Sequence, residues 1–161
     1  MNFPKPTREA KVRKPLKRGG RRGKQTSKRR KERLELKKQA EILWARWIKR
    51  DGLCEFRGHG GHHYCRGQLQ AMHGFGRKAY PAVRFSAWNG FCGCAAIHSY
   101  FTWRSPEWEN FLRGRWGEAK YQERLRLAMT VAKPDLAKVV ETYTALLAGA
   151  PLPEAWRGGW R

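Results

Sequence analysis

Two histidines and one asparagine, set at fixed intervals, constrain this chain more than any other feature. They are His73, Asn89 and His98, with fifteen residues between the first two and eight between the last two. Hydrolysis of a phosphodiester needs a base for the attacking water, a cation for the phosphate charge, and a group that orients the base. A neutral imidazole suits the first task near pH 7, and a divalent metal such as Mg²⁺ or Mn²⁺ suits the second. We therefore expect His73 to be the general base, His98 a ligand of the catalytic metal, and Asn89 the orienting group.

The residues around these three predict a β-hairpin followed by a helix. Leu69–His73 is the first expected strand, and residues 74–82, which contain Gly and Pro, form a connection. Val83–Phe85 is the second expected strand, and Ala95–Trp103 is the helix that carries His98. The predicted fold class is α+β, with this small unit flanked by further helices.

Four cysteines lie close to histidines in the same part of the chain: Cys54, Cys65, Cys92 and Cys94. The Gly-rich segment 53–68 predicts a loop, and two cysteines flanking such a loop are typical of a zinc knuckle. Four thiolates can bind zinc tetrahedrally, and one of them can be replaced by a histidine of the loop (His59, His62 or His63). The alternative is that all four are reduced thiols in the core.

Positive charge dominates the chain, which has a formal net charge of +22. Residues 1–38 contain 17 Lys/Arg and 3 Asp/Glu, and the remainder is also basic. This balance favours a polyanionic partner, because each neutralised phosphate releases condensed counterions. We expect DNA; charge alone would also allow an RNA-associated, ribosome-like protein. The expected DNA-binding residues are Arg13, Lys14, Lys17, Arg18, Arg21, Arg22, Arg77 and Arg84, the last as a bidentate phosphate clamp.

The spacing of apolar residues predicts the helices outside the hairpin region. Residues 1–27 lack such spacing and are expected to be disordered without a ligand. Apolar residues at helical spacing predict a helix over 28–50, with a charged first half, core tryptophans, and Gly52 at its end. Ser105 is the expected cap of the next helix. Further helices are expected over 118–131 and from Asp135 to Gly149.

These elements divide the chain into four parts. We expect a disordered basic arm that tracks phosphates, a ββα domain with its preceding helix, C-terminal helices, and a flexible tail. Their bounds are 1–35, 36–112, 113–149 and 150–161.

Several segments resemble the HNH endonuclease family, and more narrowly the NinG/Rap recombination proteins of bacteriophages. The likeness covers residues 36–128, and the basic segment 13–18 also resembles the start of these phage proteins. The resemblance implies a ββα-metal fold and hydrolysis of DNA phosphodiester bonds, with a preference for branched intermediates such as four-way junctions or D-loops. A junction resolvase needs two active sites, which favours a homodimer. The segments that carry the likeness are Arg50–Cys54, Leu69–His73, Arg84–Phe85, Asn89–Gly90 and Ser105–Tyr121.

The chain departs from the family pattern at four positions. Arg57 and Ile97 stand where the family often has zinc cysteines. Met72 precedes the expected base, where many members have Asp or His, and Thr102 stands where some have another His. The departures at Met72, Ile97 and Thr102 support a second hypothesis, in which the chain is a non-catalytic, zinc-stabilised DNA-binding protein with an HNH-like fold.

The sequence shows no membrane signal. Its first residues are charged and lack the apolar core of a signal peptide. Its apolar runs fall far short of the ~20 residues needed to cross a bilayer. We therefore expect a cytoplasmic protein without membrane contact, in the host cytoplasm if it is encoded by a phage.

Overall fold

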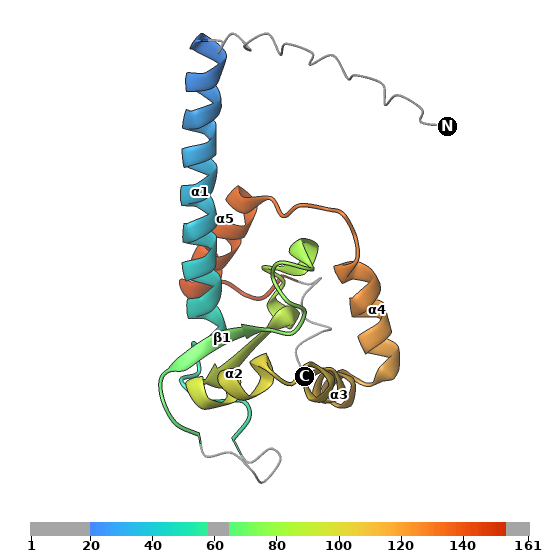
Figure 1. The fold of residues 1–161 in the computed structure, drawn as a ribbon. Helices are drawn as coiled ribbons and strands as arrows, with labels where there is room; N and C mark the ends of the chain where they lie inside the picture. Colours follow the sequence, from blue (N-terminus) through green and yellow to red (C-terminus); the bar gives the residue numbers. More distant parts are fainter. Residues whose placement is uncertain (1–19, 58–64, 154–161) are drawn as a thin grey trace, which may run out of the picture.

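The structure, a computed structural model, describes residues 20–57 and 65–153, with side chains from residue 27 on. The described residues form five α-helices and one two-stranded antiparallel sheet (Figure 1). The predicted α+β class is therefore confirmed. The elements are α1 (Gly20–Ile48), β1 (Leu69–His73), β2 (Gly90–Cys94), α2 (Ala95–Thr102), α3 (Ser105–Trp116), α4 (Glu118–Ala128) and α5 (Leu136–Leu147).

The long helix α1 packs through its second half only. Ala40, Trp44 and Trp47 are buried, which confirms the expected core position of the tryptophans. They pack against α5 and the hairpin. The helix ends before Gly52, which has a φ of 67°, a value that glycine adopts without strain.

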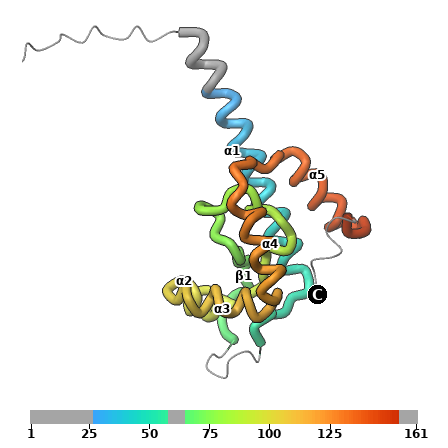
Figure 2. The backbone as a smooth tube through the Cα atoms, turned by 90° about the vertical axis from the view of Figure 1, so that its right-hand side faces the viewer, coloured from blue at the N-terminus to red at the C-terminus, as the bar shows by residue number. Residues whose placement is uncertain are grey.

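The first half of α1 projects away from the rest of the protein (Figures 1 and 2). The helix predicted over 28–50 is present but begins at residue 20, so the prediction of a disordered arm through residue 35 is wrong for residues 20–35. Lys, Arg, Gln and Glu are good helix formers, so a helix nucleated in the packed half can extend through them. Residues 1–19, the remainder of the predicted arm, lie outside the described residues.

The hairpin has the predicted first strand and a different second strand. β1 pairs antiparallel with β2, with Leu69 opposite Cys94 and His73 opposite Gly90. The prediction of a strand at Val83–Phe85 is wrong, because Pro81 begins a 3-10 turn, Pro81–Val83, in the connection. A second turn, Ala87–Asn89, leads directly into β2.

The helices after the hairpin follow the predicted order. Ser105 is not a cap: it lies inside α3, where Arg104 is the N-cap residue and no side chain caps the helix. Asp135 does cap α5, since its carboxylate accepts hydrogen bonds from the amides of Ala137 and Lys138. Gly149, with a φ of 95°, follows the end of that helix as expected.

Two hydrophobic clusters meet at the hairpin. The first joins Phe91 of β2 to α3 and α4, and the second joins Cys92 of β2 to α1 and α5. The predicted boundary at residue 112 therefore does not divide the fold: it falls inside α3, and Leu112 shares the first cluster with Tyr121 of α4. Leu152 packs against the second cluster, so the predicted loose tail is in part attached. Residues 154–161 lie outside the described part of the chain.

Membrane insertion by a helix finds no support in the described segments. None of their helices combines the length and apolar character that crossing a bilayer requires.

Candidate active site and metal centre

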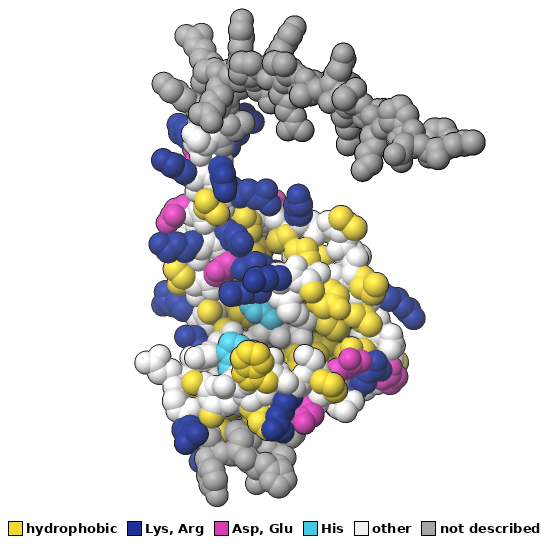
Figure 3. All heavy atoms as spheres, viewed as in Figure 1, with side chains coloured by type: hydrophobic (Ala, Val, Ile, Leu, Met, Phe, Trp, Pro, Cys, Tyr) yellow, Lys and Arg dark blue, Asp and Glu magenta, His cyan; other side chains and the backbone are white. Residues whose placement is uncertain are grey.

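His73 and His98 come together beside the hairpin. His73 is the last residue of β1, and His98 lies on α2, which packs against β1. Both line a cleft of about 610 Å³ walled by α1, and both line a second cleft of about 280 Å³ walled by α3. Figure 3 shows the described histidines on one face, below a group of Lys and Arg side chains. The spacing of the two histidines in the sequence thus corresponds to proximity in the fold.

Asn89 is fully buried and braces the connection between the strands. Its Oδ1 accepts a hydrogen bond from the amide of Phe75 at 2.6 Å. Its Nδ2 donates to the carbonyls of Phe75 at 3.2 Å and Val83 at 3.0 Å. The amide of Gly74 donates to the Asn89 carbonyl at 2.8 Å. These bonds fix the chain immediately after His73, so Asn89 can orient His73 through the backbone.

Replacing Asn89 by Ala is expected to lower the free energy of unfolding by roughly 2–4 kcal/mol, because it leaves buried backbone groups without partners. Urea denaturation measures the change. The control is Asn110→Ala, at an exposed position on α3, which is expected to change stability by less than about 0.5 kcal/mol. Equal effects of the two substitutions would contradict the bracing role.

The His73 ring is stacked and partly buried. Its centroid lies 4.2 Å from that of Trp44, with an interplanar angle of 20°. Burial, followed by the nearby Arg84 and Arg77, lowers the pKa of His73 to about 4, so the imidazole is neutral at pH 7. Nε2 is buried without a hydrogen-bond partner among the described residues. Such a nitrogen is uncommon in folded proteins, and a catalytic role is one explanation for it.

His98 is exposed, and its orientation is set by a residue that the sequence did not indicate. Its Nδ1 is hydrogen-bonded to Oε1 of Gln70 on β1. An amide oxygen only accepts, so Nδ1 is the donor in this bond and the neutral ring leaves Nε2 as its acceptor nitrogen. This is how histidine ligands of metals are commonly held, with the second ring nitrogen bonded to an oxygen. His98 can therefore offer Nε2 to a metal ion.

The two arginines predicted to bind DNA near the site differ in how freely their side chains can contact a ligand. Arg77 is exposed and lines the larger cleft. Arg84 forms an ion pair with Glu41 of α1, and its side chain is only 14% exposed. The expected clamp role of Arg84 does not fit this arrangement, because its Nη2 is bonded to Glu41 and its Nε is buried. Of the other predicted DNA-binding residues, Arg13, Lys14, Lys17 and Arg18 lie outside the described residues, and Arg21 and Arg22 lie on the projecting end of α1.

Three of the four cysteines converge. The sulfurs of Cys54, Cys65 and Cys94 all lie within 4.8 Å of one another, so this group can hold a metal ion such as zinc. Sulfurs bound tetrahedrally at 2.3 Å from zinc would lie roughly 3.8 Å apart, which this arrangement allows. The amide of Cys94 also donates to Sγ of Cys54 at 3.3 Å.

The thiols of this group differ, since the pKa of Cys94 is lowered whereas burial and a hydrogen bond with Cys54 raise the pKa of Cys65 to about 11. Burial raises the pKa of Cys94, but hydrogen bonds with the backbone of Ile97 and Arg66 and with the Cys54 and Cys65 side chains together leave it below its ordinary value. Metal ions bind the thiolate form, so a lowered pKa favours ligation.

The predicted zinc ligand Cys92 is not part of this group. It is buried in the second cluster, and burial, together with Glu55, raises its pKa to about 11. The prediction of four converging thiolates is therefore wrong at Cys92, which is a protonated core residue. The alternative histidine ligands, His59, His62 and His63, lie outside the described residues.

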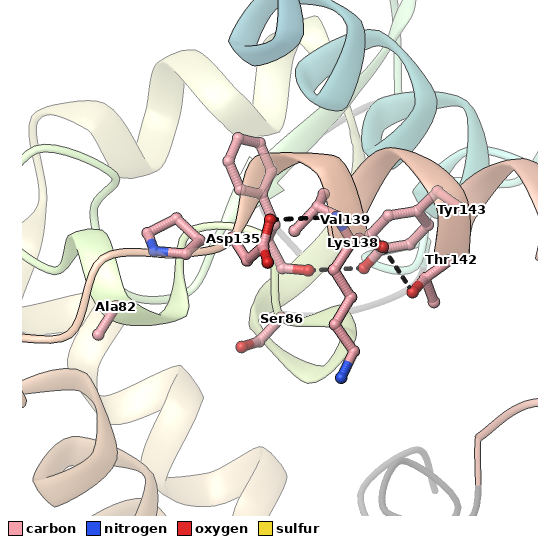
Figure 4. Close-up of a pocket in the computed structure, with 9 residues that line it drawn as sticks. Ala82, Ser86, Asp135, Lys138, Val139, Thr142 and Tyr143 are labelled. Carbon is pink, nitrogen blue, oxygen red and sulfur yellow. Dashed lines mark hydrogen bonds between the residues drawn. The ribbon is translucent and has the colours of Figure 1, made fainter. Parts of the chain in front are cut away.

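A smaller cavity of about 210 Å³ lies between α5 and the connection (Figure 4). Its polar groups serve the fold: Asp135 caps α5, the Thr142 hydroxyl donates to the Lys138 carbonyl, and the Tyr143 hydroxyl donates to the Phe85 carbonyl at 2.7 Å. None of the predicted site residues lines it, so it is separate from the candidate site.

No family model, no curated protein and no solved structure matches this chain. The site must therefore be judged on its own geometry. That geometry adds residues which sequence reasoning missed: Gln70 beside His98, Trp44 beneath His73, and Trp108, whose indole N–H donates to the Gly74 carbonyl at 2.8 Å. Each acts through a contact between separate elements, for which the sequence carries no spacing signal.

Proposed function

We propose that this protein is a metal-dependent HNH endonuclease that hydrolyses DNA phosphodiester bonds. One observation carries the proposal: β1, β2 and α2 form a hairpin followed by a helix, with His73 and His98 at shared clefts and Asn89 bracing the connection. The order of the three residues along this unit is that of the family which the sequence resembles. The excess of basic residues supplies affinity for a polyanion.

The proposed chemistry assigns one task to each residue. His73, neutral at pH 7, takes the proton from the attacking water. His98 offers Nε2 to Mg²⁺ or Mn²⁺, which would stabilise charge on the phosphate and the departing 3′ oxygen. Asn89 holds the backbone beside His73. The exposed Arg77 contacts phosphate in the larger cleft.

The cysteine group supports a separate structural role. We propose that Cys54, Cys65 and Cys94 bind zinc, with a fourth ligand from the His-rich loop. The three cysteines come from the segment after α1, the segment before β1, and the junction of β2 with α2. A zinc ion there would join these segments and hold the hairpin in place beside α1.

A non-catalytic DNA-binding protein is the second candidate. Within residues 20–57 and 65–153, the cysteines are the only group of three or more His, Cys, Asp or Glu residues close enough to share a metal. Met72 is buried in the core, and the Thr102 hydroxyl donates to the His98 carbonyl. A catalytic ion at His98 would therefore depend on water and substrate phosphate for its other ligands, an arrangement that Mg²⁺ tolerates.

A cleavage assay decides between the two candidates. Labelled four-way junctions and linear duplex are incubated with wild type or His98→Ala and with Mg²⁺, Mn²⁺ or no added divalent ion. We expect metal-dependent cutting by wild type, a large loss with His98→Ala, and full activity with Ser99→Ala, an exposed neighbour on α2. Faster cutting of the junction would support branched DNA as the substrate and a homodimer as the active form. Tight binding without cutting under every metal would favour the second candidate.

A further inference from the structure

One helix connects the candidate cleft with the most basic described segment. Residues Glu41, Trp44, Ala45 and Lys49 of α1 line the larger cleft. Between residues 27 and 39 the same helix carries seven Lys/Arg and two Glu. The side chains from Ser27 to Glu35 are exposed, and this half of α1 stands clear of the fold in two perpendicular views (Figures 1 and 2).

The charges on this projecting half are not evenly distributed around the helix. Helical spacing places Arg30 and Lys37, eleven and four residues before Glu41, on the side of α1 that continues the cleft wall. The same geometry places Glu32 half a turn away from Glu41 and Glu35 a third of a turn away. The cleft side of the projecting half is therefore mainly cationic: Glu32 is turned from it, whereas Glu35 stands about 40° from the line of Lys49 and is ion-paired with Lys38.

We propose that the cleft side of α1 binds the sugar–phosphate backbone of duplex DNA that flanks the bond held at the two histidines. This inference rests on the proposed function, because it takes the larger cleft as the place where DNA lies. A rise of ~1.5 Å per residue puts Lys37 about 10 Å and Arg30 about 21 Å from Trp44 along the helix axis. At ~3.4 Å per base pair, the contacts lie about three and six base pairs from the histidines.

Three features favour duplex DNA over other polyanions. A continuous helix is rigid over this length, as is a DNA duplex. Residues 20–43 contain no aromatic side chain, whereas sites for single strands use aromatic rings on which bases stack. A helix of this diameter also fits the major groove of B-form DNA, while the major groove of A-form RNA is too deep and narrow to admit one.

Two matched double variants test the proposal. R30Q/K37Q removes one Arg and one Lys from the cleft side, and K28Q/R29Q removes the same two residue types from the far side of the same segment. Gln preserves helix propensity. Binding to a linear duplex is measured by fluorescence anisotropy across a salt series, without added divalent ion, so that no cutting is required.

R30Q/K37Q is expected to reduce the slope of log K against log salt by about 1.8 and to weaken binding about tenfold near physiological salt, as two lost phosphate contacts predict. K28Q/R29Q is expected to change the slope by less than about 0.5. Hydroxyl-radical footprinting is expected to show protection extending about six base pairs to one side of the cut site with wild type, shortened with R30Q/K37Q only.

Equal losses in the two double variants would overturn the proposal, as would tighter binding of wild type to duplex RNA than to duplex DNA. The test of DNA binding by α1 can fail or succeed separately from the test of the proposed nuclease activity. If the cleft-side variant alone loses affinity and no metal supports cutting, the binding surface stands and the nuclease assignment fails. If wild type cuts DNA and both variants bind alike, the nuclease assignment stands and the role of α1 fails.

Discussion

Replacing His73 by Ala is expected to lower the rate of DNA cleavage by about 10²–10⁴-fold, the usual contribution of a positioned general base. His73 lies at the end of β1, lines both clefts and is neutral at pH 7. It is therefore in the state required to accept a proton from water. Single-turnover cleavage in saturating metal measures the loss, and the anisotropy assay measures whether DNA binding survives.

Because the His73 ring stacks on Trp44, the Ala variant also loses packing. His73→Gln preserves much of the side-chain volume and serves as the second variant, with thermal melts of both variants reporting on folding. Added imidazole is expected to restore part of the rate to His73→Ala, since it can replace the missing base. Undiminished cutting by a folded His73→Ala protein would rule out His73 as the base.

Loss of one converging cysteine is expected to abolish the zinc binding proposed for this group and to unfold the hairpin region. Cys94→Ala takes one sulfur from a group that joins three separate segments. Structural zinc contributes apparent binding free energies of about 10–16 kcal/mol in zinc-finger peptides, so the loss should be severe. Zinc content per chain and circular dichroism melting curves provide the measurement.

The matched control is Cys92→Ala, two residues away on the same strand. Cys92 lies in the second cluster and not among the converging sulfurs. This variant is expected to retain the proposed zinc binding and to lose only about 1 kcal/mol of stability from the small cavity. Loss of zinc in Cys92→Ala, or full zinc content in Cys94→Ala, would contradict the three-cysteine centre.

Features that depend on residues close together in the sequence could be predicted from it. The strand at Leu69–His73, the helix carrying His98 and the Asp135 start of α5 follow from spacing and capping chemistry. The second strand could not be found in this way. β2 is buried at every residue, so it lacks the alternation of polar and apolar residues that marks a half-buried strand. Its glycines, at positions 90 and 93, look like a turn in the sequence.

In the fold those glycines make room for neighbours. A Cβ at Gly90 would overlap Ile48 of α1, and a Cβ at Gly93 would overlap Met72 of β1. They are therefore positions of close approach within a packed sheet, and only the tertiary arrangement reveals this.

The parts of the candidate site that the sequence missed depend on contacts between elements. Gln70 reaches His98 because α2 folds back over β1, and Glu41 reaches Arg84 because α1 lies beside the connection. The different environments of Cys92 and Cys94 have a similar cause. Residues two apart on a strand normally share a face, but Cys94 is also the N-cap residue of α2, where the strand direction ends. Sequence spacing alone could not separate the core thiol of Cys92 from the Cys94 thiol, which lies in the converging group.

The hairpin that carries His73 packs against both hydrophobic clusters, so the protein is difficult to truncate without exposing buried residues. The Tyr143 hydroxyl of α5 bonds to the Phe85 carbonyl, and Tyr143 is fully buried with Trp44 and Trp47 in the second cluster. A chain cut back to the histidine region would thus expose the tryptophans of α1, including the ring that supports His73. The smallest unit able to present the histidine pair therefore includes the C-terminal helix α5, which lies well beyond the segment Leu69–His98 that contains both histidines.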